Sequence, residues 1–158
     1  MKSILTKELT KSALLLSILI VVSIFITMPT MYGYLNISDA VIMISTLILS
    51  RKSVGLVAGI GCFISDMYLG YGQYAIFTFI IKFIQGYVCK LMIDKKINYY
   101  ISFMICVIIM LIGYGITDII LNNSIEYFIV SISANLPQAI TCYLIGILLV
   151  KPISKLVK

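Results

Sequence analysis

The feature that most constrains this chain is the spacing of its charges, because long apolar runs alternate with short clusters of basic residues. Ser12–Met28, Asn98–Leu121 and Tyr127–Val150 each approach or exceed the roughly 20 residues that a helix needs to cross about 30 Å of hydrocarbon. Of the 158 residues, 61% are hydrophobic, whereas soluble domains have about 45–50%. The mean hydropathy is +1.12. The pattern predicts an all-α integral membrane protein.

The stretch Asp39–Asp66 is too long for one span and carries Arg51 and Lys52 in its middle. A single span would hold both charges near the bilayer centre, at a cost of about 2.5–3.5 kcal/mol each. Two shorter helices that turn at Ser50–Ser53 place the charges at an interface instead. This pairing also puts every basic residue except Lys82 at one face of the membrane. A re-entrant hairpin would also return the chain to the same side of the membrane and remains an alternative; we favour two spans.

We therefore predict a single transmembrane domain, residues 1–158, with six transmembrane helices and both termini in the cytoplasm (N-in, C-in), as the positive-inside tendency requires. The protein is expected in the plasma membrane. A loop over Pro29–Leu35 and a tight turn at Gly70-Tyr71-Gly72 are predicted outside. The predicted spans are Thr6–Met28, Asn36–Ser50, Ser53–Leu69, Gln73–Lys90, Asn98–Leu121 and Glu126–Val150.

The first run resembles a signal peptide, but it is longer than the usual hydrophobic region of about 7–15 residues, so we interpret it as a retained span. The net charge of +6 reflects topology, and we expect no nucleic-acid partner. The chain has no histidine, no nucleotide-binding loop and no zinc motif, and its four cysteines lie in apolar runs. We predict a binding protein that is not an enzyme and uses neither metal nor cofactor.

Polar residues recur at helical spacing in three consecutive predicted spans. The three stripes are Thr78, Lys82 and Gln85; Tyr114 and Asp118; and Ser131, Asn135 and Gln138. Lys82 lies roughly 12 Å along its helix from the outer turn. Ionisable groups at such depth usually face a partner or a cavity. We interpret Lys82, Asn135 and Gln138 as part of a binding pocket, and Thr78 and Ser131 as helix–helix contacts.

Asp39, Asp66, Asp118 and the ligand itself are the possible partners of Lys82 in this pocket.

Small residues one turn apart also let helices approach closely. For Gly55, Gly59 and Gly61 on the third span, packing inside the bundle is the favoured interpretation. Ala13 and Ser17 on the first span leave open a surface for a helix of another protein.

A series of short motifs follows the chain from Leu35 to Val150. In order they are Leu35-Asn36-Ile37-Ser38-Asp39-Ala40-Val41, Gly55-Leu56-Val57-Ala58-Gly59, Asp66, Gly70-Tyr71, Phe77-Thr78-Phe79-Ile80-Ile81-Lys82-Phe83-Ile84-Gln85-Gly86, and Asn135-Leu136-Pro137-Gln138 followed by Gly146. Together they resemble the substrate-binding S components of energy-coupling factor (ECF) vitamin transporters. The last motif differs from the usual P-x-N-x-x-Q of that family, because its proline stands between the asparagine and the glutamine.

This resemblance implies six helices, a substrate pocket in the extracellular half, and a loop after the first helix that closes it. It also implies a transmembrane coupling protein and two cytoplasmic ATPases as partners. The coupling protein would contact an A-x-x-x-A motif, which here is Ala13-Leu14-Leu15-Leu16-Ser17. The predicted substrate-binding residues are Asn36, Asp39, Tyr71, Tyr74, Lys82, Gln85, Tyr114, Asp118, Asn135 and Gln138.

The resemblance is closest to S components for hydroxymethylpyrimidine, pyridoxine or queuosine precursors, which are all small, flat, polar heterocycles. Tyrosines would stack on the ring, Lys82 and Gln138 would donate to ring acceptors, and carboxylates would accept from amino groups. Two other classes of protein remain alternatives. One is a membrane scaffold similar to the rod-shape protein MreD, and the other is a small proton-coupled transporter. The latter normally needs a deep carboxylate, whereas the acids here are predicted near the ends of spans.

Overall fold

The computed structural model describes residues 2–30 and 33–157. Within this part of the chain there are six helices and one two-stranded sheet. The helices are α1 (Lys2–Phe25), α2 (Ser38–Ser45), α3 (Arg51–Leu69), α4 (Gly72–Asp94), α5 (Tyr99–Asn122) and α6 (Tyr127–Val157), and the strands are β1 (Thr27–Thr30) and β2 (Gly33–Asn36). All helices except α2 are long and apolar enough to cross a membrane. The chain is therefore a multi-pass membrane protein of predominantly helical class.

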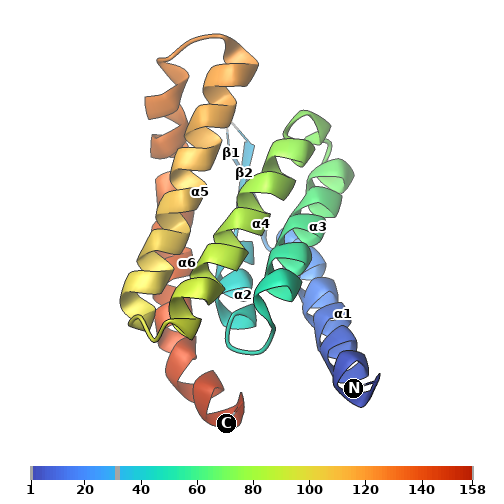
Figure 1. Cartoon of the computed structure of the whole chain (residues 1–158). Coiled ribbons are helices and arrows are strands. Elements are labelled where there is room, and N and C mark those ends of the chain that lie inside the picture. The colour runs from blue at the N-terminus through green and yellow to red at the C-terminus, as the bar shows by residue number, and fades with distance from the viewer. Residues whose placement is uncertain (1, 31–32, 158) are drawn as a thin grey trace.

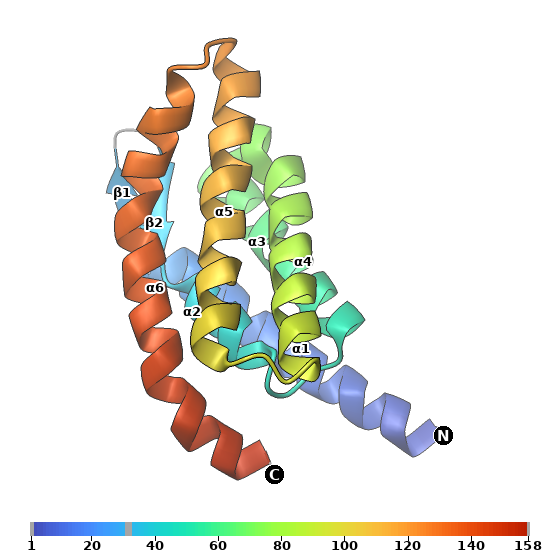
Figure 2. The ribbon, with the colours of Figure 1, turned by 60° about the vertical axis from the view of Figure 1, so that its left-hand side comes forward.

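The helices form a bundle around α2 (Figures 1 and 2). Helices α3, α4, α5 and α6 pack against one another in chain order, and α1 packs on the free side of α3. The short helix α2 contacts α1 and α6 and so links the two ends of this row. Both chain termini lie at the same end of the bundle (Figure 1).

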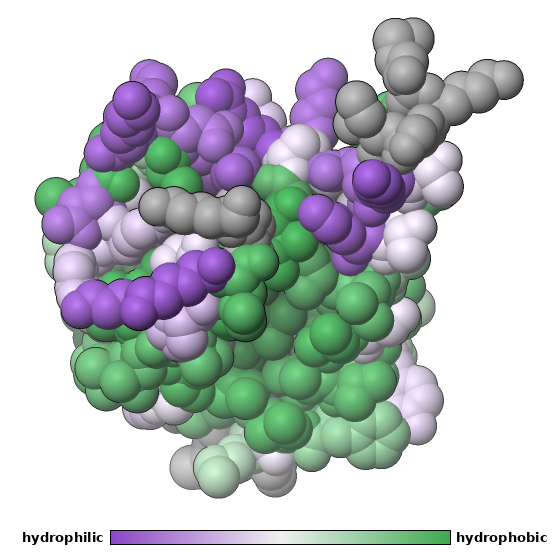
Figure 3. All heavy atoms as spheres, turned by 90° about the horizontal axis from the view of Figure 1, so that it is seen from below, coloured by the Kyte–Doolittle hydropathy of each residue, from purple (hydrophilic) through white to green (hydrophobic). Residues whose placement is uncertain are grey.

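Two polar contacts join different elements at the end of the bundle that carries both termini, and a third lies within α4. The carboxylate of Glu8 on α1 accepts the backbone N–H of Ser50, at 2.8 Å. Arg51 at the start of α3 pairs with Asp94 at the end of α4, at 2.7 Å, and Lys90 lies 3.1 Å from the same carboxylate. Seen from this end, hydrophilic side chains gather along the rim and hydrophobic ones cover the flank (Figure 3). The segments predicted to share one face of the membrane thus lie together.

The segment predicted as the second span, Asn36–Ser50, does not form a helix of that length. β2 ends at Asn36, and α2 has 8 residues, which rise only about 12 Å. Regular helix ends after Ser45, where the hydroxyl of Thr46 donates to the carbonyl of Met43 at 2.5 Å, a bond that competes with the helical pattern. Five helices rather than six therefore meet the length of a span. The predicted break in Asp39–Asp66 is present, because α2 ends at Ser45 and α3 begins at Arg51, but α2 is too short to be a span of its own.

The segment Pro29–Leu35, predicted as a loop, instead contributes to an antiparallel hairpin in which Thr27 pairs with Asn36 and Met28 pairs with Leu35. Residues 31 and 32 of that segment lie outside the described residues. The hairpin also ends α1 at Phe25, before the predicted end at Met28. Because β2 folds back along α6, α2 begins inside the bundle (Figure 2). This position carries Asp39 into the interior, whereas the sequence suggested the outer end of a span.

Glycines on α3 allow this helix to pack closely against α4 and α1. A Cβ added at Gly55 would lie 3.0 Å from the ring of Phe83, and one at Gly59 would lie 3.0 Å from the ring of Phe79. A Cβ at Gly61 would collide with Leu19 on α1 at 2.4 Å. The interpretation of these glycines as internal packing residues is confirmed. The predicted turn after α3 is also present, since the helix ends at Gly70 with φ of +85°, a conformation that glycine adopts readily.

A candidate substrate-binding site

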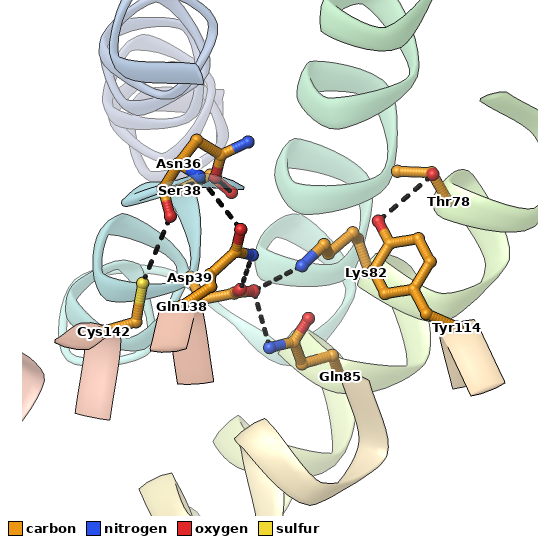
Figure 4. A network of polar contacts seen from close by, with 9 residues as sticks. All are labelled: Asn36, Ser38, Asp39, Thr78, Lys82, Gln85, Tyr114, Gln138 and Cys142. Carbon is orange, nitrogen blue, oxygen red and sulfur yellow. Dashed lines mark hydrogen bonds and ion pairs between the residues drawn. The ribbon is translucent and has the colours of Figure 1, made fainter. Parts of the chain in front are cut away.

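The centre of the site is the carboxylate of Asp39, which is fully buried at the start of α2. Lys82 on α4 donates to Oδ1 at 2.5 Å, and Gln85, one turn further along the same helix, donates to Oδ1 at 2.8 Å. Gln138 on α6 donates to Oδ2 at 2.8 Å. Figure 4 shows these side chains converging on Asp39 from two helices. The charge of Lys82, only 2% exposed, is therefore paired with Asp39, one of its predicted partners.

The hairpin is attached to this centre by hydrogen bonds. The other oxygen of Gln138, Oε1, accepts the backbone N–H of Asn36 at 2.9 Å. The side chain of Asn36 accepts both the N–H and the hydroxyl of Ser38, at 2.9 and 2.5 Å, at the beginning of α2. The thiol of Cys142 on α6 donates to the carbonyl of Asn36 at 3.5 Å. Gln138 thus binds Asp39 with one end and β2 with the other, which fixes where α2 starts.

A second group of polar side chains comes from β2 and from α3, α4 and α5. The hydroxyl of Tyr34 on β2 donates to Oδ1 of Asp66 on α3, and that of Tyr74 donates to Asp118 at 2.6 Å. Burial and the neighbouring Asp66 charge raise the pKa of Tyr34, so this phenol remains a hydrogen-bond donor. The ammonium of Lys82 also lies 5.4 Å from the centre of the Tyr114 ring, within the range of a cation–π contact.

These groups surround a cavity of about 70 Å³. Eight of the ten predicted substrate-binding residues line it: Asn36, Tyr71, Tyr74, Lys82, Tyr114, Asp118, Asn135 and Gln138. The other two, Asp39 and Gln85, do not line the cavity. Asp39 accepts from Lys82 and Gln138 behind the cavity wall, and Gln85 donates to Asp39. The amide of Asn135 donates to the carbonyl of Ser131 in its own helix, at 2.9 Å.

The cavity also has lining residues that sequence reasoning left out of the site. They are Tyr34, Leu35, Ser38, Cys62, Asp66, Thr78 and Ala134. Thr78 belongs to the polar stripe of α4 but had been interpreted as a helix contact; its hydroxyl lies 3.2 Å from that of Tyr114. Asp66 had been considered only as a partner for Lys82. Its place beside Tyr34 depends on the hairpin, which no periodicity in the sequence indicates.

The arrangement suits binding of a small polar molecule. Side chains from β2 and from all helices except α1 reach the cavity, so a ligand there would contact most of the bundle at once. The rings of Tyr34 and Tyr71, whose centres lie 5.0 Å apart, supply flat apolar surface, while Lys82 and the carboxylates of Asp66 and Asp118 supply charge. Hydrophobic surface with a few placed polar groups is the usual composition of a ligand pocket.

The fold and the cavity define a multi-pass membrane protein with an internal polar site. The family model described as "ECF-type riboflavin transporter, S component" matches residues 3–155. The chain therefore belongs to this family of ECF transporter S components. It is also similar to a protein of Pyrococcus woesei described as "Uncharacterized protein in gap 3'region", with 29% identity over 92 residues. That match covers 56% of this chain and 62% of the Pyrococcus protein.

Proposed function

We propose that this protein is the substrate-specific subunit of an ECF-type importer, which captures a small vitamin-like heterocycle in the cavity beside Lys82. The observation that carries the proposal is a cavity whose polar groups are held in position by hydrogen bonds to neighbouring residues. Asp39 fixes Lys82 from behind, and Gln138 joins α6 to the hairpin. Preorganised groups bind a ligand more tightly, because less conformational entropy is lost on binding.

The size of the cavity favours a single-ring or small bicyclic substrate. The family description names riboflavin, which has three fused rings and a ribityl chain. A cavity of about 70 Å³ corresponds to roughly five to seven waters, which is nearer to one substituted ring than to a flavin. Hydroxymethylpyrimidine, pyridoxine and queuosine-precursor compounds are of this smaller class. Tyr34 and Tyr71 would stack on such a ring, and Lys82 would donate to one of its acceptor atoms.

Transport would depend on partners that bind the outer face of α1. Ala13 and Ser17 are both exposed on that helix, and Ser17 uses its hydroxyl on the carbonyl of Ala13, at 2.9 Å. Ala13 and Ser17 therefore present a narrow surface, on which the Ser17 hydroxyl already has a hydrogen-bond partner. Close helix approach over small residues is the usual way that helices associate in a bilayer. We assign this surface to the coupling protein, with two cytoplasmic ATPases supplying the energy.

The end with both termini would face the cytoplasm. Arg51 and Lys52 at the start of α3 and Lys95 and Lys96 after α4 all belong to this end, as does Lys155 near the end of α6. Cytoplasmic segments carry an excess of lysine and arginine. The cavity, which opens among the hairpin and the opposite ends of the helices, would then face outward and receive substrate from outside the cell.

The test is the melting temperature of the purified protein with a panel of compounds. The panel contains hydroxymethylpyrimidine, pyridoxine, a deazaguanine precursor of queuosine, and riboflavin. We expect a member of the three smaller classes to raise the melting temperature, because a ligand that binds only the folded state stabilises it. Stabilisation by riboflavin alone would contradict the substrate class. A protein that no compound stabilises would favour the scaffold alternative.

A further inference from the structure

The carboxylate of Asp66 has one oxygen that the described part of the fold leaves unpaired. Asp66 is 4% exposed and lines the cavity. Its Oδ1 accepts the hydroxyl of Tyr34. Oδ2 is buried and has no partner at hydrogen-bond distance among the described residues, although the hydroxyl of Thr78 lies near the carboxylate. Buried polar atoms are rarely left unpaired, because they lose their bonds to water on burial. An orphaned carboxylate oxygen at a cavity wall therefore indicates a missing donor.

The charges around the cavity also indicate that a donor from a ligand belongs there. Among the described lining residues, Lys82 is the cation and Asp66 and Asp118 are the carboxylates. Lys82 is already neutralised by Asp39, which lies behind the cavity wall at 2.5 Å. The carboxylates of Asp66 and Asp118 receive tyrosine hydroxyls, and neither forms a salt bridge with a cationic side chain of the described residues. The cavity therefore has negative charge that a ligand can balance.

We infer that the substrate carries an amino group, protonated or attached to an electron-poor ring, that donates to Oδ2 of Asp66. This inference rests on the proposed function and adds the chemical group that the site selects. The rings of Tyr34 and Tyr71, 5.0 Å apart, lie next to this carboxylate, since Tyr34 itself donates to Asp66. Aromatic faces attract a cationic or electron-poor group. A neutral ring without a donor leaves Oδ2 unpaired and binds less tightly.

The experiment compares matched compounds with and without the amino group. Three pairs cover the proposed classes: 4-amino-5-hydroxymethyl-2-methylpyrimidine and its 4-methoxy analogue, pyridoxamine and 4-deoxypyridoxine, and 7-aminomethyl- and 7-methyl-7-deazaguanine. Affinities are measured by titration calorimetry on the purified full chain. For the pair that binds, we expect the amino compound to have a Kd about 10- to 150-fold lower, as for one hydrogen bond to a charged group.

The variant Asp66→Asn assigns this difference to its residue. Asparagine keeps the shape and can still accept from Tyr34, but it replaces one carboxylate oxygen by an amide donor. We expect the preference for the amino compound to disappear, while the melting temperature without ligand stays equal or rises, since a buried charge without a cationic partner is removed. Asp94→Asn is the matched control, because Asp94 lies at the far end of α4 and pairs with Arg51. It should leave the preference unchanged.

Each other outcome is decisive. If a pair binds with equal affinity for both members, or if Asp66→Asn keeps the amino preference, the inference is wrong while the proposed function stands. If the methoxy or methyl compound binds more tightly to the wild-type protein, Asp66 is a protonated donor and the inference is also wrong. If none of the six compounds binds the wild-type protein and riboflavin does not bind either, the proposed function itself fails.

Discussion

Lys82 and Asp39 form an ion pair in the interior of the bundle, with 2.5 Å between Nζ and Oδ1 and side-chain exposures of 2% and 0%. Lys82 comes from α4 and Asp39 from the short helix α2, so the pair links these two helices inside the bundle. Asp39 also receives Gln85 and Gln138, so side-chain donors occupy three of the roughly four acceptor sites of a carboxylate. The pair is therefore structural as well as electrostatic, and Lys82 reaches the cavity from a fixed position.

The first prediction concerns this pair. Removing one partner of a buried ion pair costs about 3–5 kcal/mol, because the other charge is left uncompensated. Lys82→Met should therefore lower the melting temperature of the ligand-free protein sharply. Adding Asp39→Asn should recover part of the loss, because the remaining group is neutral. If the two substitutions lower the melting temperature additively, the pair does not stabilise the fold.

The second prediction concerns the contact between α3 and α4. Gly59→Ala places a Cβ 3.0 Å from both the ring and the carbonyl oxygen of Phe79, and overpacking of this kind costs about 1–3 kcal/mol. Gly72→Ala is the matched control, since its Cβ would meet the sulfur of Met67 at 3.5 Å, an ordinary contact distance. In detergent, Gly59→Ala should melt at a lower temperature than the wild-type protein, whereas Gly72→Ala should melt at about the same temperature. Equal melting temperatures would mean that the helices separate to admit the methyl group at no cost.

The third prediction separates binding from transport. Ala13→Phe and Ser17→Phe alter exposed positions of α1 and should leave ligand affinity unchanged. Uptake in cells that contain the coupling protein and ATPases should fall, because a bulky ring prevents close helix approach. Ile108→Phe, at an exposed position of α5, is the control and should transport normally. A parallel loss of ligand affinity in the α1 variants would assign Ala13 and Ser17 to the fold rather than to a partner surface.

The fourth prediction concerns orientation. The native cysteines are all buried, so they can be replaced and single cysteines introduced at exposed sites. Lys95→Cys and Lys155→Cys should be protected from an impermeant thiol reagent applied to intact cells, whereas Glu126→Cys, in the connection between α5 and α6, should react. Permeabilised cells give the labelling of all three sites for comparison. Labelling of the Lys95 site from outside would reverse the proposed orientation.

The polar stripes could be predicted from sequence because they require only helical periodicity. Residues three or four apart share one face whatever the neighbouring helices do, so Lys82 with Gln85 and Tyr114 with Asp118 were found without a structure. The two glycines of Gly70-Tyr71-Gly72 located the tight turn at Gly70, where the backbone has a positive φ. Long helices and short polar turns are thus the part of this fold that local patterns determine.

The position of α2 could not be predicted in this way. It depends on the hydrogen bond between Asn36 and Gln138, which are 102 residues apart, and on a hairpin whose residues show no strand alternation. The apolar content of 36–50 resembled a span, but Ser45 and Thr46 direct their hydroxyls to backbone carbonyls where the helix ends. Asp66 entered the site for the same reason, since its partner Tyr34 belongs to the hairpin.

Substitution of Asn135 tests most directly whether the cavity binds substrate. The Asn135 amide donates to the carbonyl of Ser131 in its own helix, at 2.9 Å, and this local bond should contribute little to the fold. Asn122 makes the same bond to the carbonyl of Asp118, also at 2.9 Å, but does not line the cavity. The two asparagines therefore form a matched pair for substitution.

The measurement is the Kd of the stabilising compound by calorimetry for Asn135→Ala, Asn122→Ala and the wild-type protein. We expect Asn135→Ala to weaken binding by about 1–3 kcal/mol, since a ligand group is left unpaired, with a melting temperature close to that of Asn122→Ala. Asn122→Ala should bind as the wild-type protein does. Unchanged affinity in Asn135→Ala would contradict the central claim that this cavity is the substrate site.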